Sequence, residues 1–343
     1  MATLILFISL VVIFVGAEVF TNALEHLGQR LKISEGVTGS IFAAIATALP
    51  ETMVPIVAIL GASAAQEVRE DVAIGAILGA PLMLSTLAFF LMGLFAARKR
   101  GWGDALRPER TGLTRDLSWF LMAFGLATVA MFIPSTAALL RASIVLALVV
   151  MYFLYLMLTI RASARLVQDG HATEADHPLY FVYYPQKIGV SLPDNMAFIV
   201  IQLAVGFGLI VVGARTFVRG VDMLSTQIGV SALILSLLII PVATELPEKV
   251  NSILWIRRRR DTLAFGNITG AMVFQGSLLP ALGIVLTPWE ARPDVIFGAG
   301  LTLATTAYLL ILKRRSVLRP YHLVVNGLCY LAYFLLVALF IAL

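Results

Sequence analysis

The sequence predicts an all-α polytopic membrane protein with ten transmembrane helices, arranged as two inverted five-helix repeats. Three observations support this fold class: an apolar composition, ten long apolar stretches, and a segment that occurs twice. Hydrophobic residues make up 60% of the 343 residues and charged residues only 13%, with a mean hydropathy of +0.94. Soluble domains contain about 45–50% apolar and about 25% charged residues. The composition therefore excludes an ordinary water-soluble enzyme and a disordered chain.

The ten apolar stretches are each roughly 18 to 27 residues long, enough for a helix to cross a hydrocarbon core about 30 Å thick. No basic residue precedes the first stretch, so we do not expect a cleavable signal peptide. We expect helices over residues 3–24, 37–62, 71–96, 116–134, 138–160, 196–218, 230–256, 262–286, 294–312 and 321–342.

The basic residues lie mainly in the loops that follow the odd-numbered stretches. These loops contain 19 of the 25 Lys and Arg residues, including the run Arg257–Arg260. Because cytoplasmic loops are rich in Lys and Arg, we expect a multi-pass protein of the inner (cell) membrane with both termini outside the cytoplasm. Short arginine clusters beside helices are what this topology requires, so the basic charge does not indicate a nucleic-acid partner.

Two segments of the first half recur in the second half at one offset of 197 residues. Residues 15–27 (VGAEVFTNALEHL) align with 212–224 (VGARTFVRGVDML), and ATALPE at 46–51 aligns with ATELPE at 243–248. Each half contains five predicted helices, and an odd number makes the second half enter the membrane in the opposite orientation. Inverted repeats of this kind are typical of secondary transporters, whose substrate sites lie at the repeat interface.

The repeat divides the chain into three parts. We expect the first repeat over residues 1–161, a polar cytoplasmic linker over 162–194, and the second, inverted repeat over 195–343.

A proline lies inside each of the two repeated LPE segments. Pro50 and Pro247 have no amide hydrogen, so each frees the carbonyl four residues earlier, at Ala46 and Ala243, and bends its helix. Within a membrane, a freed carbonyl needs a partner such as a water, a hydroxyl or a cation.

Carboxylates follow both prolines directly. These carboxylates are Glu51 and Glu248. Thr47 and Thr244 lie one turn before them, on the same face of the respective helix. Carboxylate, hydroxyl and carbonyl oxygens within one turn suit Na⁺ or Ca²⁺ better than a soft metal. A charged residue in a membrane costs at least about 2.5–3.5 kcal/mol on insertion scales, so such carboxylates usually have a function. The alternative is that both glutamates pair with Arg or Lys between helices in a purely structural role.

The helix after each LPE segment contains paired glycines. Residues 266–276 (GNITGAMVFQG) also contain Asn267 and Gln275, two uncharged oxygen ligands about two turns apart. The first half has Ala76 and Leu84 at these two positions, and we expect Pro81 to break its helix. Glycine spacing alone indicates close helix packing, whereas the two amides are candidates for direct ligation.

Glu245, within the second LPE segment, has two interpretations. It is either a third carboxylate of the site or the partner of Lys249, four residues later in the favourable order for an ion pair along a helix. A lysine beside an ion site can also take the place of a monovalent cation, and we keep this role of Lys249 as a hypothesis.

The paired LPE segments and the glycine-rich segments after them, in two five-helix halves, resemble the sodium/calcium exchanger membrane region of the calcium:cation antiporter superfamily over essentially the whole chain. The resemblance implies ten helices, a central site that binds Ca²⁺ and Na⁺ or H⁺ alternately, and sliding of the first and sixth helices. By residue match, it implies Glu51 and Glu248 as central carboxylates, Thr47 and Thr244 as backbone and hydroxyl ligands, and Gln275 as an amide ligand. The chain departs from the family motifs at Ala48, Ala80, Leu84, Glu245 and Ala271.

These observations predict a secondary active cation antiporter that exchanges Ca²⁺ for Na⁺ or H⁺ by alternating access. The alternatives are an antiporter for Mg²⁺, Mn²⁺ or a monovalent ion with H⁺ coupling, and a transport-inactive or channel-like member of the fold. No HExxH, GxSxG or Ser/His/Asp set lies in or near a span, so we do not expect an enzyme. We expect no cofactor, inorganic cations and the lipid bilayer as partners, and a functional monomer.

Overall fold

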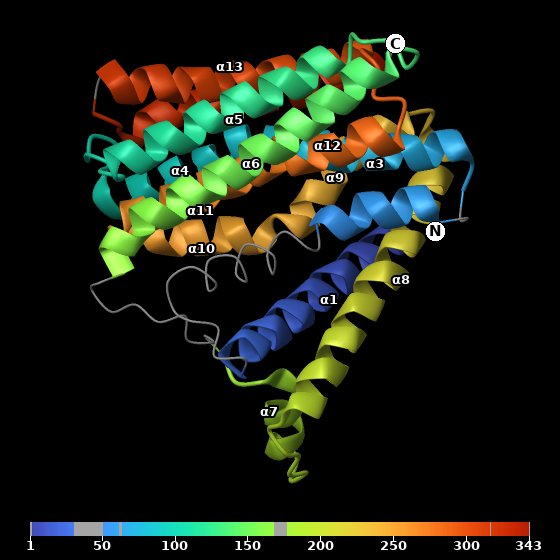
Figure 1. Cartoon of the computed structure of the whole chain (residues 1–343), viewed down its shortest axis with the longest axis vertical. Coiled ribbons are helices and arrows are strands. Elements are labelled where there is room, and N and C mark those ends of the chain that lie inside the picture. Colours follow the sequence, from blue (N-terminus) through green and yellow to red (C-terminus); the bar gives the residue numbers. More distant parts are fainter. Residues whose placement is uncertain (1, 31–50, 62–63, 168–176, 316, 343) are drawn as a thin grey trace.

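A computed structural model describes residues 2–30, 51–61, 64–167, 177–315 and 317–342, and this part of the chain is almost entirely helical (Figure 1). An isolated β-bridge joins Leu106 and Leu318. The helical elements in chain order are α1 (Ala2–Arg30), the helix Glu51–Leu60, α3 (Gln66–Met83), the π-helical turn η1 (Leu84–Ala88), α4 (Phe89–Arg100), α5 (Arg110–Ala130), α6 (Ala138–Val167), α7 (Tyr180–Lys187), α8 (Met196–Ile228), α9 (Ala232–Thr244), α10 (Leu246–Arg257), α11 (Asp261–Gln275), α12 (Leu278–Leu286), α13 (Pro293–Arg315), the 3₁₀ turn η2 (Pro320–Leu323) and α14 (Val324–Ala342).

Six helices in the described part are long and apolar enough to cross a membrane. They include α1, α8 and α13, and the run from Gln66 to Arg100 that joins α3, η1 and α4. The expected α-helical membrane protein is thereby confirmed. Helices α6 and α8 begin at Ala138 and Met196, as expected, but end at Val167 and Ile228, beyond the predicted ends at residues 160 and 218.

Within the described ranges, an irregular turn is found in three of the predicted helices. The stretch 230–256 divides at Glu245 between α9 and α10, and 262–286 divides after Gln275 between α11 and α12. In the stretch 71–96 we expected Pro81 to break the helix, and this was wrong. The α-helix continues through Pro81, and the wider π-helical turn η1 follows it.

Side chains satisfy the carbonyls around the π-helical turn, which is why the helix continues there. The hydroxyl of Thr86 donates to the carbonyl of Leu82, and the Ser85 hydroxyl donates to the same oxygen at 3.2 Å. The amide of Asn326 on α14 donates to the Ser85 carbonyl at 2.7 Å. Single π turns within α-helices are often found near functional sites.

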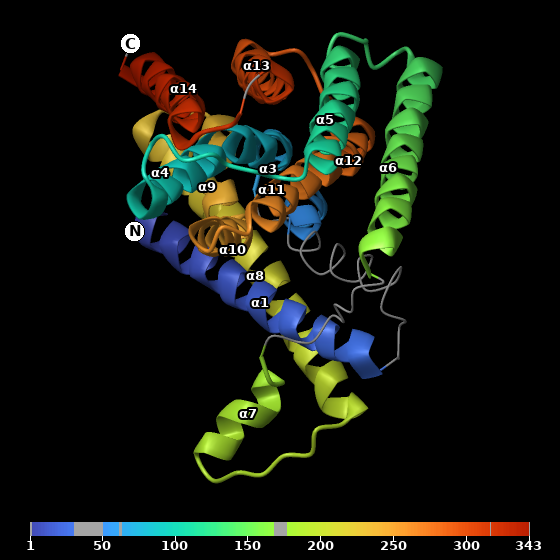
Figure 2. The same ribbon diagram turned by 90° about the vertical axis from the view of Figure 1, so that its left-hand side faces the viewer.

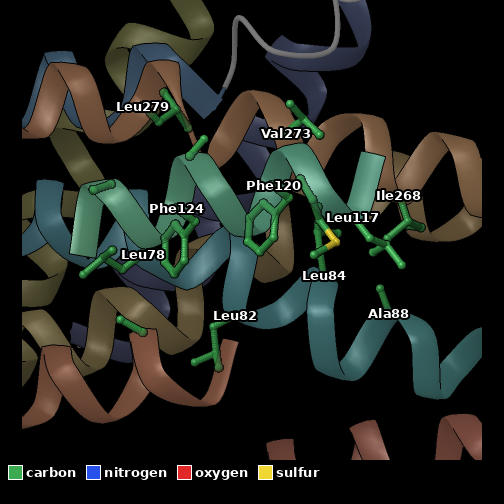
Figure 3. Packing of buried hydrophobic residues seen from close by; sticks show 14 of the residues in the cluster. Leu78, Leu82, Leu84, Ala88, Leu117, Phe120, Phe124, Ile268, Val273 and Leu279 are labelled. Atoms are coloured by element: carbon green, nitrogen blue, oxygen red, sulfur yellow. The ribbon is translucent and has the colours of Figure 1, made fainter. Parts of the chain in front are cut away.

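The main hydrophobic core lies between α5 and the α3–α4 and α11–α12 helices. Leu117, Phe120 and Phe124 recur at helical spacing on one face of α5, and all are fully buried there (Figure 3). The rings of Phe120 and Phe124 stack with centroids 5.2 Å apart. Trp289 closes this core and donates its indole N–H to the Ala127 carbonyl at 3.0 Å. This core holds α11 in place, and α11 ends at Gln275.

Helices α1 and α8 lie side by side along most of their length, and both views show the pair extending away from the main bundle (Figures 1 and 2). Glycines make their close approach possible. A Cβ atom on Gly16 would lie 2.9 Å from the Ile210 amide nitrogen, and one on Gly206 would lie 2.7 Å from the Phe20 nitrogen. Small residues of this kind let transmembrane helices pack backbone to backbone.

The helices α3 and α9 also cross at glycines. A Cβ atom on Gly75 would lie 2.7 Å from the Leu233 carbonyl oxygen, and one on Gly79 would overlap the Leu237 carbonyl. The end of α3, at Met83, is therefore held against the end of α9, next to the break at Glu245.

Helix α7, in the predicted linker, is bound to both α1 and α8. The amide of Gln202 on α8 donates to Asn22 Oδ1 on α1 at 2.8 Å, and its own oxygen accepts from the Phe181 amide at 2.9 Å. Asn22 Oδ1 also accepts from the Tyr180 amide at 3.1 Å, while the Tyr180 hydroxyl donates to Glu18 Oε1 at 2.7 Å. Figure 2 shows α7 beyond the ends of this helix pair.

Candidate ion-binding site

Residues from three parts of the helical structure bring polar side chains together inside the protein. Glu51 is the first described residue of the helix Glu51–Leu60, Glu245 forms the break between α9 and α10, and Gln275 is the last residue of α11. Glu51 is 6% exposed, and both Glu245 and Gln275 are fully buried. The structure thus joins a residue of the first half of the sequence to two residues of the second.

The amide of Gln275 connects the two carboxyl groups. Its Nε2 atom donates to Glu51 Oε2 at 2.7 Å and to Glu245 Oε1 at 2.8 Å. The carboxyl groups of Glu51 and Glu245 also lie within hydrogen-bonding range of each other. Because an ionised carboxylate can only accept, this contact is favourable only with a proton or a cation between the two groups.

Two oxygen atoms at this junction receive no hydrogen bond from any described residue. Oε2 of Glu245 and Oε1 of Gln275 are both buried, and neither accepts a hydrogen bond from the described residues. A buried acceptor without a partner costs about 1–3 kcal/mol, and more when the acceptor is charged. Unpartnered oxygens from a carboxylate and an amide are ligands that suit a hard cation.

The break at Glu245 follows from the local sequence. Pro247 cannot donate to a carbonyl in the preceding turn, so α9 ends at Thr244, and the proline lies in the first turn of α10, where no intrahelical donor is needed. The Glu245 amide donates to the Pro241 carbonyl at 3.2 Å. The predicted bend at Pro247 is therefore a change from one helix to the next.

Of the other predicted ligands, some form hydrogen bonds of their own and some are not described by the structure. Thr244 is buried, and its hydroxyl donates to the Ile240 carbonyl at 3.3 Å. The Asn267 amide donates to the Ser252 hydroxyl at 3.0 Å, which links α11 to α10. Ala243 lies in α9 and Glu248 in α10, with their side chains outside the described part, and Ala46 and Thr47 lie outside the described residues altogether.

Lys249 reaches back across the same break. Its side chain is buried, and the ammonium lies 3.1 Å from the Pro241 carbonyl oxygen and 2.8 Å from the sulfur of Met83. It also interacts electrostatically with Glu245. Sequence reasoning missed Met83, because a methionine in an apolar helix carries no signal that marks it as part of a polar site.

Hard oxygen ligands dominate this junction. No cluster of three or more His, Cys, Asp or Glu residues is found within the described ranges. The described groups are two carboxyls, one carboxamide and one ammonium, which together can hold a hard cation or a proton, and provide no thiolate or imidazole for a soft metal.

Two segments of the chain, residues 1–161 and 198–343, match the model of the sodium/calcium exchanger protein family. The chain belongs to the sodium/calcium exchanger family. It is therefore an α-helical membrane protein of a family of cation antiporters, and not an enzyme. The resemblance noted in the sequence is confirmed.

Named relatives of this exchanger-family chain match over most of their length. The "Putative antiporter CaxA" of Alkalimonas amylolytica is 26% identical over 324 residues, covering 93% of this chain and 92% of that protein. The "Inner membrane protein YrbG" of Escherichia coli K12 is 26% identical over 300 residues, covering 85% and 82%.

Solved structures show the same fold. The crystal structure of the H⁺/Ca²⁺ exchanger CAX has a TM-score of 0.71 and 15% identity, covering 99% of this chain and 86% of the other. The sodium-calcium exchanger NCX_Mj, soaked with Na⁺ and Sr²⁺, has a TM-score of 0.55 and 15% identity, with 97% of each chain covered.

Proposed function

We propose that this protein exchanges Ca²⁺ for Na⁺ or H⁺ by alternating access at the junction of the helix Glu51–Leu60, α9–α10 and α11. The observation that carries the proposal is a pair of buried oxygens, on Glu245 and Gln275, that accept no hydrogen bond from the described residues and lie next to the Glu51 carboxyl. The proposed ligand set is Glu51, Glu245, Glu248 and Gln275, with Thr47, Thr244, Asn267 and the carbonyls of Ala46 and Ala243; Glu51 and Glu248 hold the divalent ion.

The chemistry of the junction supports competition between ions. When Ca²⁺ is bound, the carboxylates and the amide oxygen give it several hard ligands. When Ca²⁺ leaves, Glu51 and Glu245 stay close together and need a proton or a monovalent cation between them. Binding of one ion therefore excludes the other, which is what exchange requires.

The full membrane architecture is part of the proposal. We place ten transmembrane helices in two inverted repeats, residues 1–161 and 195–343, joined by a cytoplasmic linker over 162–194, with both termini outside. The division agrees with the two segments that match the family model. It is also supported by two irregular turns at positions that correspond in the repeat, η1 beginning at Leu84 and the turn after Gln275.

Radiolabelled Ca²⁺ uptake into proteoliposomes tests the function. An outward Na⁺ or H⁺ gradient should drive uptake by the wild-type protein, and Glu51→Gln and Glu248→Gln should each abolish it. Glu290→Gln, an exposed carboxylate in the turn before α13, is the matched control and should leave uptake unchanged. Loss of uptake in the control, or full uptake in both site variants, would refute the carboxylate site.

The cation itself needs a second comparison. If neither gradient drives Ca²⁺ uptake by well-folded protein, the same assay with Mg²⁺, Mn²⁺ and monovalent ions tests the alternative substrates with H⁺ coupling. Counterflow separates an antiporter from a channel-like protein, because exchange needs an ion on the opposite side and passive flux does not. The proposed unit is a monomer in the inner membrane, with inorganic cations as its partners.

A further inference from the structure

We infer that Lys249 is a built-in cation of the transport site. Its ammonium occupies a monovalent-cation position at the C-terminal end of α9, so the protein moves one monovalent cation fewer per divalent ion than the same site would without the lysine. This inference rests on the proposed exchange function and specifies its stoichiometry.

The position of the ammonium is the first argument. The end of a helix carries a partial negative charge on its unpaired carbonyls. In transporters with interrupted helices, the C-terminal ends of half-helices and unwound carbonyls coordinate Na⁺ or H⁺. Helix α9 ends at Thr244. Lys249 Nζ lies 3.1 Å from the carbonyl oxygen of Pro241 in the last turn of α9, and this oxygen, which has two lone pairs, also accepts from the Glu245 amide.

The surroundings of the ammonium are the second argument. Lys249 is only 8% exposed, and a buried ammonium must be compensated by negative charge or dipoles. Among the described residues, the Pro241 carbonyl and the fully buried Glu245 carboxylate contribute to this compensation. These are the same kinds of oxygen that a bound Na⁺ would use. A third neighbour, Met83 Sδ at 2.8 Å, is a weak acceptor that contributes little.

The asymmetry between the halves is the third argument. At the offset of 197 residues, Glu245 corresponds to Ala48 and Lys249 to Thr52. The acid and the base are both present in the second half and both absent from the first. Together they add a carboxylate and a cation without changing the net charge, as expected if the lysine has replaced a bound ion and the glutamate is its counter-charge.

The consequence concerns coupling. A tethered ammonium cannot dissociate, so the position that it fills takes no part in the cycle. Removing its charge while keeping Glu245 leaves an anionic position beside the Pro241 carbonyl, open to a small monovalent cation. The inference therefore predicts a gain of Na⁺ binding when a positive charge is removed.

Equilibrium binding of ²²Na⁺ to the purified full-length protein, without Ca²⁺, tests this directly. We expect Lys249→Gln to bind one more Na⁺ per molecule at saturation than the wild type. Lys249→Thr, which copies Thr52, should behave in the same way and provides a second uncharged variant. Lys249→Arg, which keeps the charge, should bind the wild-type number.

Two controls separate this effect from a general loss of buried charge. The double variant Glu245→Gln/Lys249→Gln should lose the extra Na⁺, because the counter-charge is gone. Arg141→Gln removes another buried cation near a helix end, one that donates to the carbonyls of Ile284 and Pro288 beside the end of α12, and it should gain no Na⁺.

The result that would overturn the inference is equal Na⁺ binding by the wild type and by both folded uncharged variants. A gain in Lys249→Arg or in Arg141→Gln would overturn it as well. Because Na⁺ binding is measured without Ca²⁺ or a gradient, the outcome can be read even if the wild type fails to transport Ca²⁺. Failure of the Ca²⁺ assay and failure of this inference are therefore distinguishable.

Discussion

Replacement of Gly206 by alanine tests the packing of α1 against α8. A Cβ atom at this position would lie 2.7 Å from the Phe20 nitrogen and 2.9 Å from its Cα. This is about 0.7 Å short of the 3.4 Å at which ordinary van der Waals contact begins. The atoms in conflict belong to the backbone of α1, so a rotamer change cannot relieve the overlap, and the two helices must separate locally.

The expected cost comes from two opposing effects. Overpacking of this kind costs about 1–3 kcal/mol, while alanine favours a helix over glycine by about 1 kcal/mol. Gly208 is two residues away on α8, and a Cβ atom added there would meet no other atom within 4 Å, so Gly208→Ala gains the second effect without the first. The two variants should therefore differ by about 1–3 kcal/mol, with Gly206→Ala the less stable.

Thermal unfolding of both variants in the same detergent, beside the wild type, measures this difference. Uptake by reconstituted protein provides a second readout, because the resemblance to the exchanger family implies that the first and sixth helices slide. If Gly206→Ala is as stable as Gly208→Ala, the close α1–α8 contact does not limit stability, and the reasoning from backbone overlap is wrong.

Three further predictions concern contacts outside the site. Arg100→Met leaves the buried carboxylate of Asp261 without its ion-pair partner, now 2.5 Å away, and should cost about 3–5 kcal/mol in a chemical unfolding experiment; adding Asp261→Leu should restore most of this loss. Burial acts to raise the pKa of Glu109, but hydrogen bonds from two amides in the first turn of α5 outweigh it and hold this pKa below its ordinary value of 4.5. Because its pKa is lower in the folded state, the ionised Glu109 carboxylate stabilises the fold above pH 4.5, and this stabilisation is lost as the pH falls through the folded-state pKa. At neutral pH, Glu109→Gln should therefore be less stable than the wild type by about 0.5–1 kcal/mol. Below about pH 4 the two proteins should approach the same stability. Tyr180→Phe removes the hydroxyl that donates to Glu18 and should lower stability by on the order of 1 kcal/mol, measured by thermal unfolding.

Each of these predictions has a clear contrary outcome. A double variant at Arg100 and Asp261 no more stable than Arg100→Met would show that the cost is not that of an unpaired charge. A constant difference between Glu109→Gln and the wild type from pH 7 to pH 3 would exclude the proposed cap. An unchanged midpoint for Tyr180→Phe would mean that the Glu18 contact adds nothing to the binding of α7.

The positions of the helices could be predicted because they depend on local composition. A run of about 20 apolar residues must form a helix in a membrane, whatever its neighbours are. The division at Glu245 was also visible, through Pro247. The π-helical turn after Pro81 was not, because it depends on Asn326 from a distant helix, and a proline by itself predicts a break.

For the candidate site, the kinds of side chain could be predicted from the sequence, but not which of them contact one another. The two LPE segments and Gln275 identified candidate oxygen ligands, but spacing along one helix could not decide whether Glu245 joins the site or pairs with Lys249. In the structure, the Glu245 carboxyl accepts from Gln275 at 2.8 Å and interacts electrostatically with Lys249, and its role as an ion ligand stays a prediction. Helix α7 was missed because its sequence is short and contains Pro185, and its contacts are with residues far away in the chain.

The attachment of α7 provides a labelling position away from the candidate ion-binding site. Since α7 hydrogen-bonds to α1 through Asn22 and to α8 through Gln202, any movement of that helix pair must carry α7 with it. Tyr184 on α7 is 58% exposed and takes part in none of the hydrogen bonds that attach α7 to the pair. A dye attached there would travel with α1 and α8, and its distance to a second dye on the main bundle would show whether this helix pair moves during the proposed exchange.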